Sequence, residues 1–72
     1  MEERKVTNKD LKFGKKLKRI RKNLGFTQED LADKTRLSTT FIGLLEIGKR
    51  RPSIKTLQKI ASALKIDVKD LF

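Results

Sequence analysis

One local pattern occurs five times along this chain and constrains its fold more than any other feature. A short polar residue that can cap a helix N-terminus is preceded by an apolar residue and followed four places later by another. This arrangement is the hydrophobic staple, and an acid three places after the cap completes a capping box. The five caps are Thr7, Thr27, Ser38, Ser53 and Asp67. Five helix starts in 72 residues predict an all-α fold.

The apolar residues between these caps recur at helical spacing. Four of them mark one face of the first predicted helix, at intervals of four, three and four residues: Phe13, Leu17, Ile20 and Leu24. Gly25 follows as a left-handed helix stop. The other residues predicted to face the core are Leu31, Ala32, Ile42, Leu45, Leu57, Ile60, Ala61 and Leu64. The predicted helices span residues 8–24, 28–35, 39–47 and 54–64, with a final turn or two over 68–72.

The whole chain is predicted to form one domain. A chain of 72 residues buries a limited core, so dimerisation is a natural way to add buried area. We expect residues 1–7 to form a flexible basic arm and residues 8–72 a single domain. The apolar runs are far too short to span a membrane, and the N-terminus lacks the apolar stretch of a signal peptide. We therefore expect a cytoplasmic protein without a membrane partner.

Charge is unevenly distributed along the chain. The net charge is +10 at pH 7, an excess that is typical of proteins with an anionic partner. Residues 1–24 carry ten Lys or Arg against three Asp or Glu, and residues 48–72 carry seven against two. Residues 27–47, in contrast, carry two Lys or Arg against four Asp or Glu. This pattern fits either a solvated surface or a phosphate-binding one, and we favour the phosphate-binding interpretation.

The chain lacks the residue types that most enzymes and metal sites use. It contains no cysteine and no histidine, so the usual acid–base and thiol arrangements are missing, as are thiolate metal sites. Glu29 and Asp33 lie one helical turn apart, but such pairs are usually solvated. The sequence has no Gly-rich phosphate loop. We therefore expect no enzyme, no cofactor, no metal and no small-molecule substrate.

The second and third predicted helices are joined by a very short turn, Thr35-Arg36-Leu37. Such a turn favours the steep crossing of a helix-turn-helix over antiparallel packing. Over residues 11–72 the sequence resembles the phage-repressor and Cro-type (XRE) family of helix-turn-helix regulators. The matching positions are Arg21, Gly25-Phe26-Thr27-Gln28, Leu31-Ala32, Leu37-Ser38, Ile42, Leu45-Glu46, Gly48-Lys49-Arg50, Pro52-Ser53, Leu57, Ile60-Ala61 and Ala63-Leu64.

This resemblance implies a compact five-helix, lambda-repressor-like domain whose third helix enters the DNA major groove. It implies a sequence-specific transcriptional regulator of double-stranded DNA, bacterial or phage-encoded and nucleoid-associated when bound. The small size is similar to that of restriction-modification controller proteins and small phage-type repressors. Because a lone domain has no effector-binding region, we expect control through protein concentration and dimerisation.

The third predicted helix carries the expected reading surface. With Ile42 and Leu45 packed inward, helical geometry turns five residues outward: Thr39, Thr40, Gly43, Leu44 and Ile47. The resemblance assigns base-edge contacts chiefly to Thr39, Thr40 and Leu44. None of these is Arg, Lys, Asn or Gln, so bidentate reading of a purine is excluded and contacts to thymine methyl groups are expected. Leu44 and Ile47 contact either DNA or protein.

Two further residues in this region are expected base contacts, although each departs from the usual pattern. Gly43 costs about 1 kcal/mol relative to alanine inside a helix, which close approach to DNA or a tight helix contact would justify. Arg36 stands where the resembling family usually has glycine in a left-handed conformation, at a cost of about 1–2 kcal/mol. Either Arg36 contacts DNA beside the groove or the turn simply tolerates it.

Five residues are expected to contact DNA phosphates: Thr27, Gln28, Lys49, Arg50 and Arg51. Gln28 opens the second helix, where backbone N–H groups and the helix dipole suit a phosphate oxygen, and the resemblance assigns it that contact. The three basic residues follow the third helix and flank the groove. The resemblance also implies a structural ion pair between Arg21 and Glu46.

The C-terminal residues Val68, Leu71 and Phe72, with part of the fourth helix, are expected either to form a homodimer surface or only to seal the core. A two-fold dimer would place its recognition helices about 34 Å apart on a pseudo-palindromic operator. The main alternative function is a protein-interaction module, such as the antitoxin of a toxin–antitoxin pair, supported by the outward apolar residues Leu44 and Ile47. RNA is a weaker candidate because aromatic stacking platforms are missing.

Overall fold

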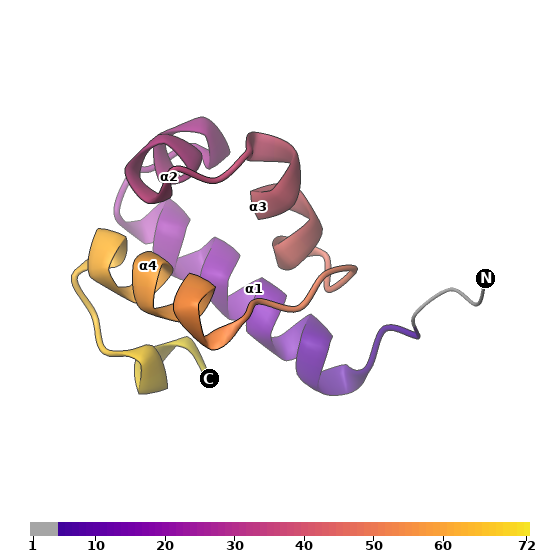
Figure 1. Ribbon diagram of the computed structural model, residues 1–72. Coiled ribbons are helices and arrows are strands. Elements are labelled where there is room, and N and C mark those ends of the chain that lie inside the picture. Colours follow the sequence, from indigo (N-terminus) through magenta and orange to yellow (C-terminus); the bar gives the residue numbers. More distant parts are fainter. Residues whose placement is uncertain (1–4) are drawn as a thin grey trace.

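Each of the five predicted caps begins a helix in the computed structural model, which describes residues 5–72 (Figure 1). The helices are α1 (Asn8–Asn23), α2 (Gln28–Thr35), α3 (Thr39–Glu46), α4 (Ile54–Leu64) and the 3-10 helix η1 (Val68–Leu71). No strand occurs within residues 5–72, and the all-α class is confirmed. The final turn expected over residues 68–72 is confirmed as η1. It is one short turn held by i→i+3 hydrogen bonds, in which Asp70 N donates to Asp67 O at 2.9 Å.

The caps form as their spacing predicts. Thr7 Oγ1 accepts a hydrogen bond from the Asp10 N–H at 3.2 Å, and Asp10 Oδ2 accepts one from the Thr7 N–H at 2.9 Å. Thr27 and the acid three residues after it repeat this reciprocal capping box at 3.0 and 2.8 Å. The side-chain oxygens of Ser38 and Ser53 cap α3 and α4. Because each such cap contributes about 1 kcal/mol, local sequence determines where the helices begin.

Two helices end one residue earlier than predicted. α1 ends at Asn23 and α3 at Glu46, because Leu24 and Ile47 are the capping residues that follow them. Placing Leu24 in the core stripe is therefore wrong, since its side chain lies beyond the helix and is 48% exposed. The left-handed stop at Gly25 is confirmed by its φ of +77°.

One core joins the four α-helices and η1 (Figure 1). Its fully buried large side chains come from every element: Leu17, Leu31, Ile42, Leu45, Ile60 and Leu71. All but Leu71 are residues that the apolar spacing predicts to face inward. Each contributes roughly 1.5–3 kcal/mol by burial, so this cluster determines how the helices pack.

α1 approaches the end of α3 closely at Gly14. A Cβ added there would lie 2.7 Å from the Leu45 carbonyl oxygen and closer still to that of Glu46. Both neighbours are backbone atoms, which cannot move aside as a flexible side chain can. Glycine is therefore required for this packing distance. Gly14 is not among the residues predicted to pack against another helix, although a glycine inside a well-capped helix is a signal of close packing.

The predicted N-terminal arm lies only partly within the described residues. Residues 1–4 fall outside them, whereas Thr7 is the N-cap of α1 rather than part of an arm. Val6 lies beside the loop after α3, since a Cβ added to Gly48 would be 3.1 Å from Val6 Cγ1. The start of the described chain thus lies close to the loop that follows α3.

Candidate nucleic-acid interface

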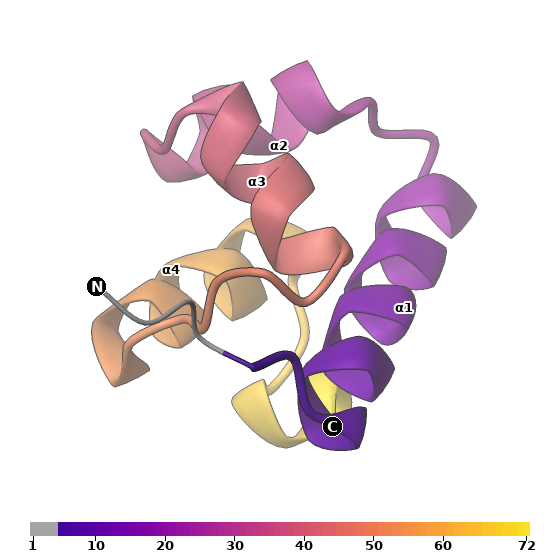
Figure 2. The same cartoon turned by 90° about the vertical axis from the view of Figure 1, so that its right-hand side faces the viewer.

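α2, a tight turn and α3 form one surface unit, with α3 in front in Figure 2. The turn is possible because Arg36 takes the left-handed conformation, with φ 58° and ψ 31°. Leu37 N then donates to Ala32 O at 3.0 Å, and Ser38 caps α3. Only three residues separate the two helices. This is the arrangement of a helix-turn-helix.

The inner face of α3 is buried, and its outer face begins with exposed residues. Ile42 and Leu45 point into the core and are fully buried. Thr39 and Thr40, for which the sequence analysis expects base contacts, are exposed at the start of the helix. Because the inner side chains fix the rotation of the helix about its axis, they also determine which residues face solvent.

Further along α3 the outer surface becomes apolar. Leu44 is half-buried, and Ile47 is 54% exposed. A Cβ added to Gly43 would lie 3.7 Å from the side-chain amide atoms of Gln28, an ordinary van der Waals distance. Helix packing therefore does not require glycine at position 43. Close approach of the helix backbone to DNA stays a prediction for Gly43.

A buried ion pair fastens the end of α3 to α1. Arg21 Nε donates to Glu46 Oε2 at 2.6 Å, and Arg21 Nη2 donates to Glu46 Oε1 at 3.0 Å. The exposed fractions of the two side chains are 6% and 2%. Arg21 Nη1 donates to the Phe26 carbonyl oxygen at 2.7 Å. The hydrogen bonds to Glu46 raise the pKa of Arg21 above its ordinary value, against the opposing effect of burial. The pair that the resemblance implies is therefore present.

Gln28 extends this network to α2. Its Nε2 donates to Glu46 Oε1 at 3.1 Å, so one carboxylate contacts side chains from both α1 and α2. Gln28 is half-buried at the first position of α2, where the sequence analysis expects a phosphate contact. A side-chain amide nitrogen carries two N–H groups, and the bond to Glu46 uses one of them. The network joins three helices at the C-terminal end of α3.

The three basic residues after α3 divide between two roles. Lys49 and Arg50 are exposed, and their backbone N–H groups donate to the Leu44 carbonyl oxygen at 2.9 and 3.3 Å. Arg51 Nε instead donates to Asp10 Oδ1 at 3.0 Å. The Arg51 side chain remains 58% exposed beside this pair, so its contact to a DNA phosphate stays a prediction. Its guanidinium group pairs with a carboxylate and ties the α3–α4 loop to the start of α1.

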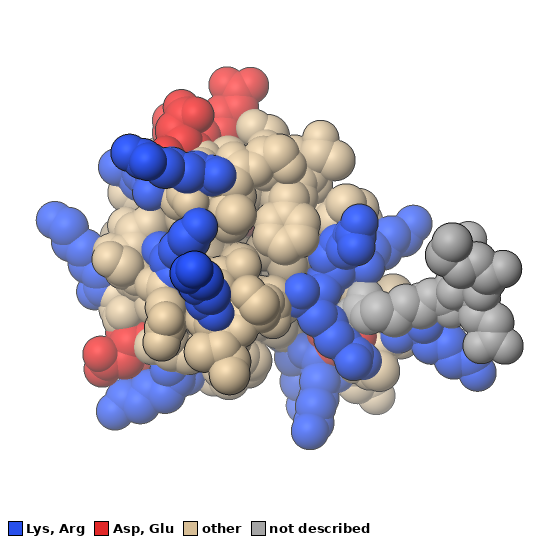
Figure 3. Space-filling model, in the orientation of Figure 1, with Lys and Arg blue, Asp and Glu red and all other residues tan. Residues whose placement is uncertain are grey.

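Surface charge follows the uneven distribution in the sequence. Figure 3 shows Lys and Arg side chains in several groups around the visible face, with Asp and Glu grouped mainly above α2. The exposed acids of α2 are Glu29, Asp30 and Asp33. Within α2 the acids thus outnumber the single basic residue, Lys34, whereas most of the basic residues lie on the other elements.

The arrangement matches a known family. The helix-turn-helix family model matches residues 17–71. The chain belongs to the helix-turn-helix family. It is 38% identical over 63 residues to control protein C.MunI of a Mycoplasma species, which covers 86% of this chain and 85% of that protein. The crystal structure of the restriction-modification controller protein C.AhdI from Aeromonas hydrophila has a TM-score of 0.90 at 35% identity, covering 92% of this chain and 100% of that one.

A phage repressor shares the same helix-turn-helix domain. The immunity repressor of Bacillus phage phi105 is 40% identical over 55 residues, which are 76% of this chain but 38% of that protein. The family consists of DNA-binding transcription regulators rather than enzymes. The chain is therefore a DNA-binding transcription regulator, which confirms the predicted family and the predicted class of function.

The C-terminal residues of this helix-turn-helix domain divide between core and surface. Val68 is half-buried, and Phe72 is 66% exposed, with its ring 5.4 Å from that of Phe13. Leu71 is fully buried among the core residues. Including Leu71 in a dimer surface is therefore wrong, because its side chain has no area to offer a partner. Leu71 instead follows the other option given for the C-terminal residues, and its side chain closes the core.

The described part of this helix-turn-helix chain has neither a cluster of metal-ligating side chains nor a helix suited to crossing a membrane. Within residues 5–72, no group of His, Cys, Asp or Glu side chains is arranged to hold a metal ion. Over the same residues, no helix combines the length and the apolar character that crossing a membrane requires.

Proposed function

We propose that this regulator acts as a two-fold dimer on a pseudo-palindromic DNA site, with α3 of each copy in a major groove. The observation that carries the proposal is the exposed outer face of α3, held in place by a fully buried inner face. An α-helix fits the width of the B-DNA major groove. Similarity to C.MunI and C.AhdI, which are named as control and controller proteins, supports a controller-type role.

Base reading rests on short side chains at the start of α3. Thr39 and Thr40 are exposed there, and a threonine offers both a hydroxyl group to a base edge and a methyl group to thymine. Leu44 adds an apolar contact, and Gly43 lets the helix backbone approach the bases. Arg36 is exposed in the turn and supplies a cation beside the groove. The preferred site should therefore depend on thymine positions.

Phosphate contacts come from both ends of the helix-turn-helix. Thr27 and Gln28 lie at the start of α2, where the helix dipole and the first backbone N–H groups attract an anion. The second amide N–H of Gln28 adds a donor there. Lys49 and Arg50 are exposed after α3 and flank the groove from the other side. Contacts to phosphates on both sides of α3 would determine how deeply the helix enters the major groove and how it is oriented there.

Exposed apolar side chains support the dimer. Phe72 is 66% exposed, and Ile54, at the start of α4, is 76% exposed. Val68 offers part of its surface as well. A two-fold interface uses the same patch on both copies, so each buried side chain counts twice in the area removed from water. The proposed dimer surface therefore consists of Phe72, Val68 and the start of α4.

DNA affinity measured at several salt concentrations tests the proposal. The logarithm of the binding constant should fall linearly with the logarithm of salt concentration, by about 0.9 per phosphate contact. Lys49→Gln and Arg50→Gln should each reduce that slope by about one contact. Lys18→Gln, on an exposed position of α1, is the matched control and should leave the slope unchanged. A flat dependence would contradict the proposal and favour the protein-interaction alternative, which the exposed Ile47 supports.

A further inference from the structure

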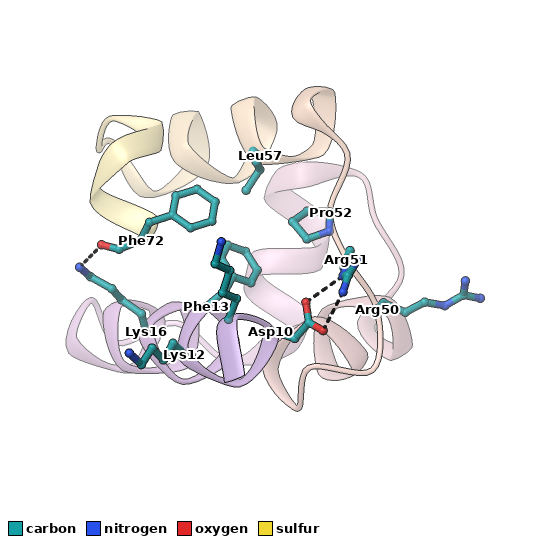
Figure 4. Close-up of a pocket in the computed structure, with 10 residues that line it drawn as sticks. Asp10, Lys12, Phe13, Lys16, Arg50, Arg51, Pro52, Leu57 and Phe72 are labelled. Carbon is teal, nitrogen blue, oxygen red and sulfur yellow. Dashed lines mark hydrogen bonds and ion pairs between the residues drawn. The ribbon is translucent and has the colours of Figure 1, made fainter. Parts of the chain in front are cut away.

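An apolar groove lies between α1 on one side and the α3–α4 loop, α4 and Phe72 on the other (Figure 4). Its volume is about 640 Å³, within the range of roughly 300–1,000 Å³ that small-molecule sites occupy. Phe13, Pro52, Leu57 and Phe72 form its apolar walls. These residues come from separate segments of the sequence, which is why sequence patterns do not predict the groove.

Two polar contacts close the ends of the groove (Figure 4). At one end Lys16 Nζ donates to the Phe72 carbonyl oxygen at 2.7 Å, and at the other Arg51 Nε donates to Asp10 Oδ1 at 3.0 Å. Asp10 carries the only acidic side chain among the described residues that line the groove. Because it also caps α1, its negative charge is already engaged.

The rim of the groove is basic. Lys9, Lys12 and Lys16 follow one another on α1 at intervals of three and four residues, so they form a row along one helix face. Within residues 5–72, neither Lys9 nor Lys12 forms an ion pair. Arg50 also lines the groove and extends past its mouth (Figure 4). The groove thus combines an apolar interior with an uncompensated positive edge.

We propose that this groove binds a free amphiphilic carboxylate, with its apolar chain between Phe13 and Leu57 and its head group on the lysine row of α1. The charge of the rim selects an anion over a neutral or cationic ligand. A second copy seated in the same groove would bring two equal lysine rows together, and such like-charge contacts are unfavourable. The inference does not depend on how DNA is read. Since Phe72 also belongs to the proposed dimer surface, bound carboxylate and dimerisation should compete.

Amide NMR spectra of the full chain, titrated with sodium decanoate below its micelle-forming concentration at constant ionic strength, test the proposal. Saturable shifts should be confined to the amides around Phe13, Leu57 and Phe72. Decyltrimethylammonium has the same chain with a cationic head, and it should bind at least about tenfold more weakly. Shifts that do not saturate, or equal affinities for the two amphiphiles, would overturn the assignment.

Lys12→Glu is the decisive variant, because Lys12 is exposed, lies on the rim and is not part of the proposed DNA interface. It should reduce decanoate affinity about tenfold, whereas Lys18→Glu, the same charge change away from the groove, should reduce it less than about twofold. The amide spectra also show that both variants are folded. Equal losses would indicate general attraction to a basic protein and overturn the proposal.

Two other occupants would be recognised by the same spectra. If the groove amides shift with protein concentration alone and decanoate has no further effect, a second copy fills the groove. If they respond only to phosphatidylglycerol vesicles and not to free decanoate, a lipid surface covers it. Either result would overturn the assignment of a free carboxylate.

Discussion

Ile42 and Leu45, on the inner face of α3, are fully buried, whereas Thr39 and Thr40, on its outer face, are exposed. The helix has eight residues, and isolated helices shorter than about 12–15 residues are marginal in water. Its inner face and the buried Glu46 must therefore hold it in place. The contrast teaches that stability and DNA reading are divided between two faces of one short helix. Inner-face changes should alter folding, and outer-face changes should alter site preference.

Glu46→Ala should have the largest effect. It leaves the buried Arg21 guanidinium without its carboxylate partner, and breaking a buried pair costs about 3–5 kcal/mol. For a domain of this size the melting temperature should fall by more than about 10 °C. Calorimetry measures the change, and Asp33→Ala, at an exposed acid of α2, is the control. An unchanged melting temperature would show that the pair does not hold α3.

Gly14→Ala should also destabilise the inner side of α3. The new Cβ would meet the backbone carbonyls of Leu45 and Glu46, and such overpacking costs about 1–3 kcal/mol. Urea denaturation should show a lower midpoint with an unchanged slope. A gain in stability, as helix propensity alone would give, would mean that α1 and α3 do not pack this closely.

Gly43→Ala is the matched substitution on the outer side. Here the Cβ has room beside Gln28, so the variant should gain up to about 1 kcal/mol from helix propensity. DNA affinity should fall, because the methyl group holds the helix backbone away from the bases. Denaturation and DNA titration of the same sample measure both effects. Lower stability, or higher stability with full DNA affinity, would remove the proposed role of Gly43.

The smallest expected effect concerns the capping box of α2. The hydrogen bond from the Thr27 backbone N–H, with a further contribution from the Thr27 side chain, holds the pKa of Asp30 below its ordinary value. A lowered folded-state pKa gives stability that is present above the ordinary carboxyl pKa and is lost as pH falls through the lowered value. The protection factors of the α2 amides, which remove the intrinsic pH dependence of exchange, should therefore fall in acid. Asp30→Asn should lose this pH dependence, and its retention would exclude the cap as the cause.

Helix starts were predictable from sequence because a cap acts between residues three apart. Thr7 with Asp10, and Thr27 with Asp30, are such pairs. The inner face of α3 was predictable for a similar reason, since Ile42 and Leu45 lie three residues apart on one side of a helix. The family resemblance identified Arg21 as the ion-pair partner of Glu46. Local spacing does not reveal this pair, because the two residues are 25 positions apart.

Contacts between distant residues were not predictable in the same way. Arg51 and Asp10 are separated by 41 positions, and Lys16 and Phe72 by 56. A basic run after the third helix is typical of phosphate binding, and nothing local shows that one member meets a carboxylate on α1. Leu71 follows the same logic: an apolar residue near the end of a chain fits a dimer surface or a core, and only the packed fold distinguishes them.

The central claim is that the outer face of α3 and its flanking arginines read the DNA sequence. Selection of bound sites from random DNA, followed by sequencing, tests it most directly. The parent protein should enrich one pseudo-palindromic site, and the variant with Thr39, Thr40, Arg36 and Arg50 all changed to alanine should lose that preference. The melting temperature of the variant serves as the folding control. If the folded variant enriches the same site, the proposed reading surface is wrong.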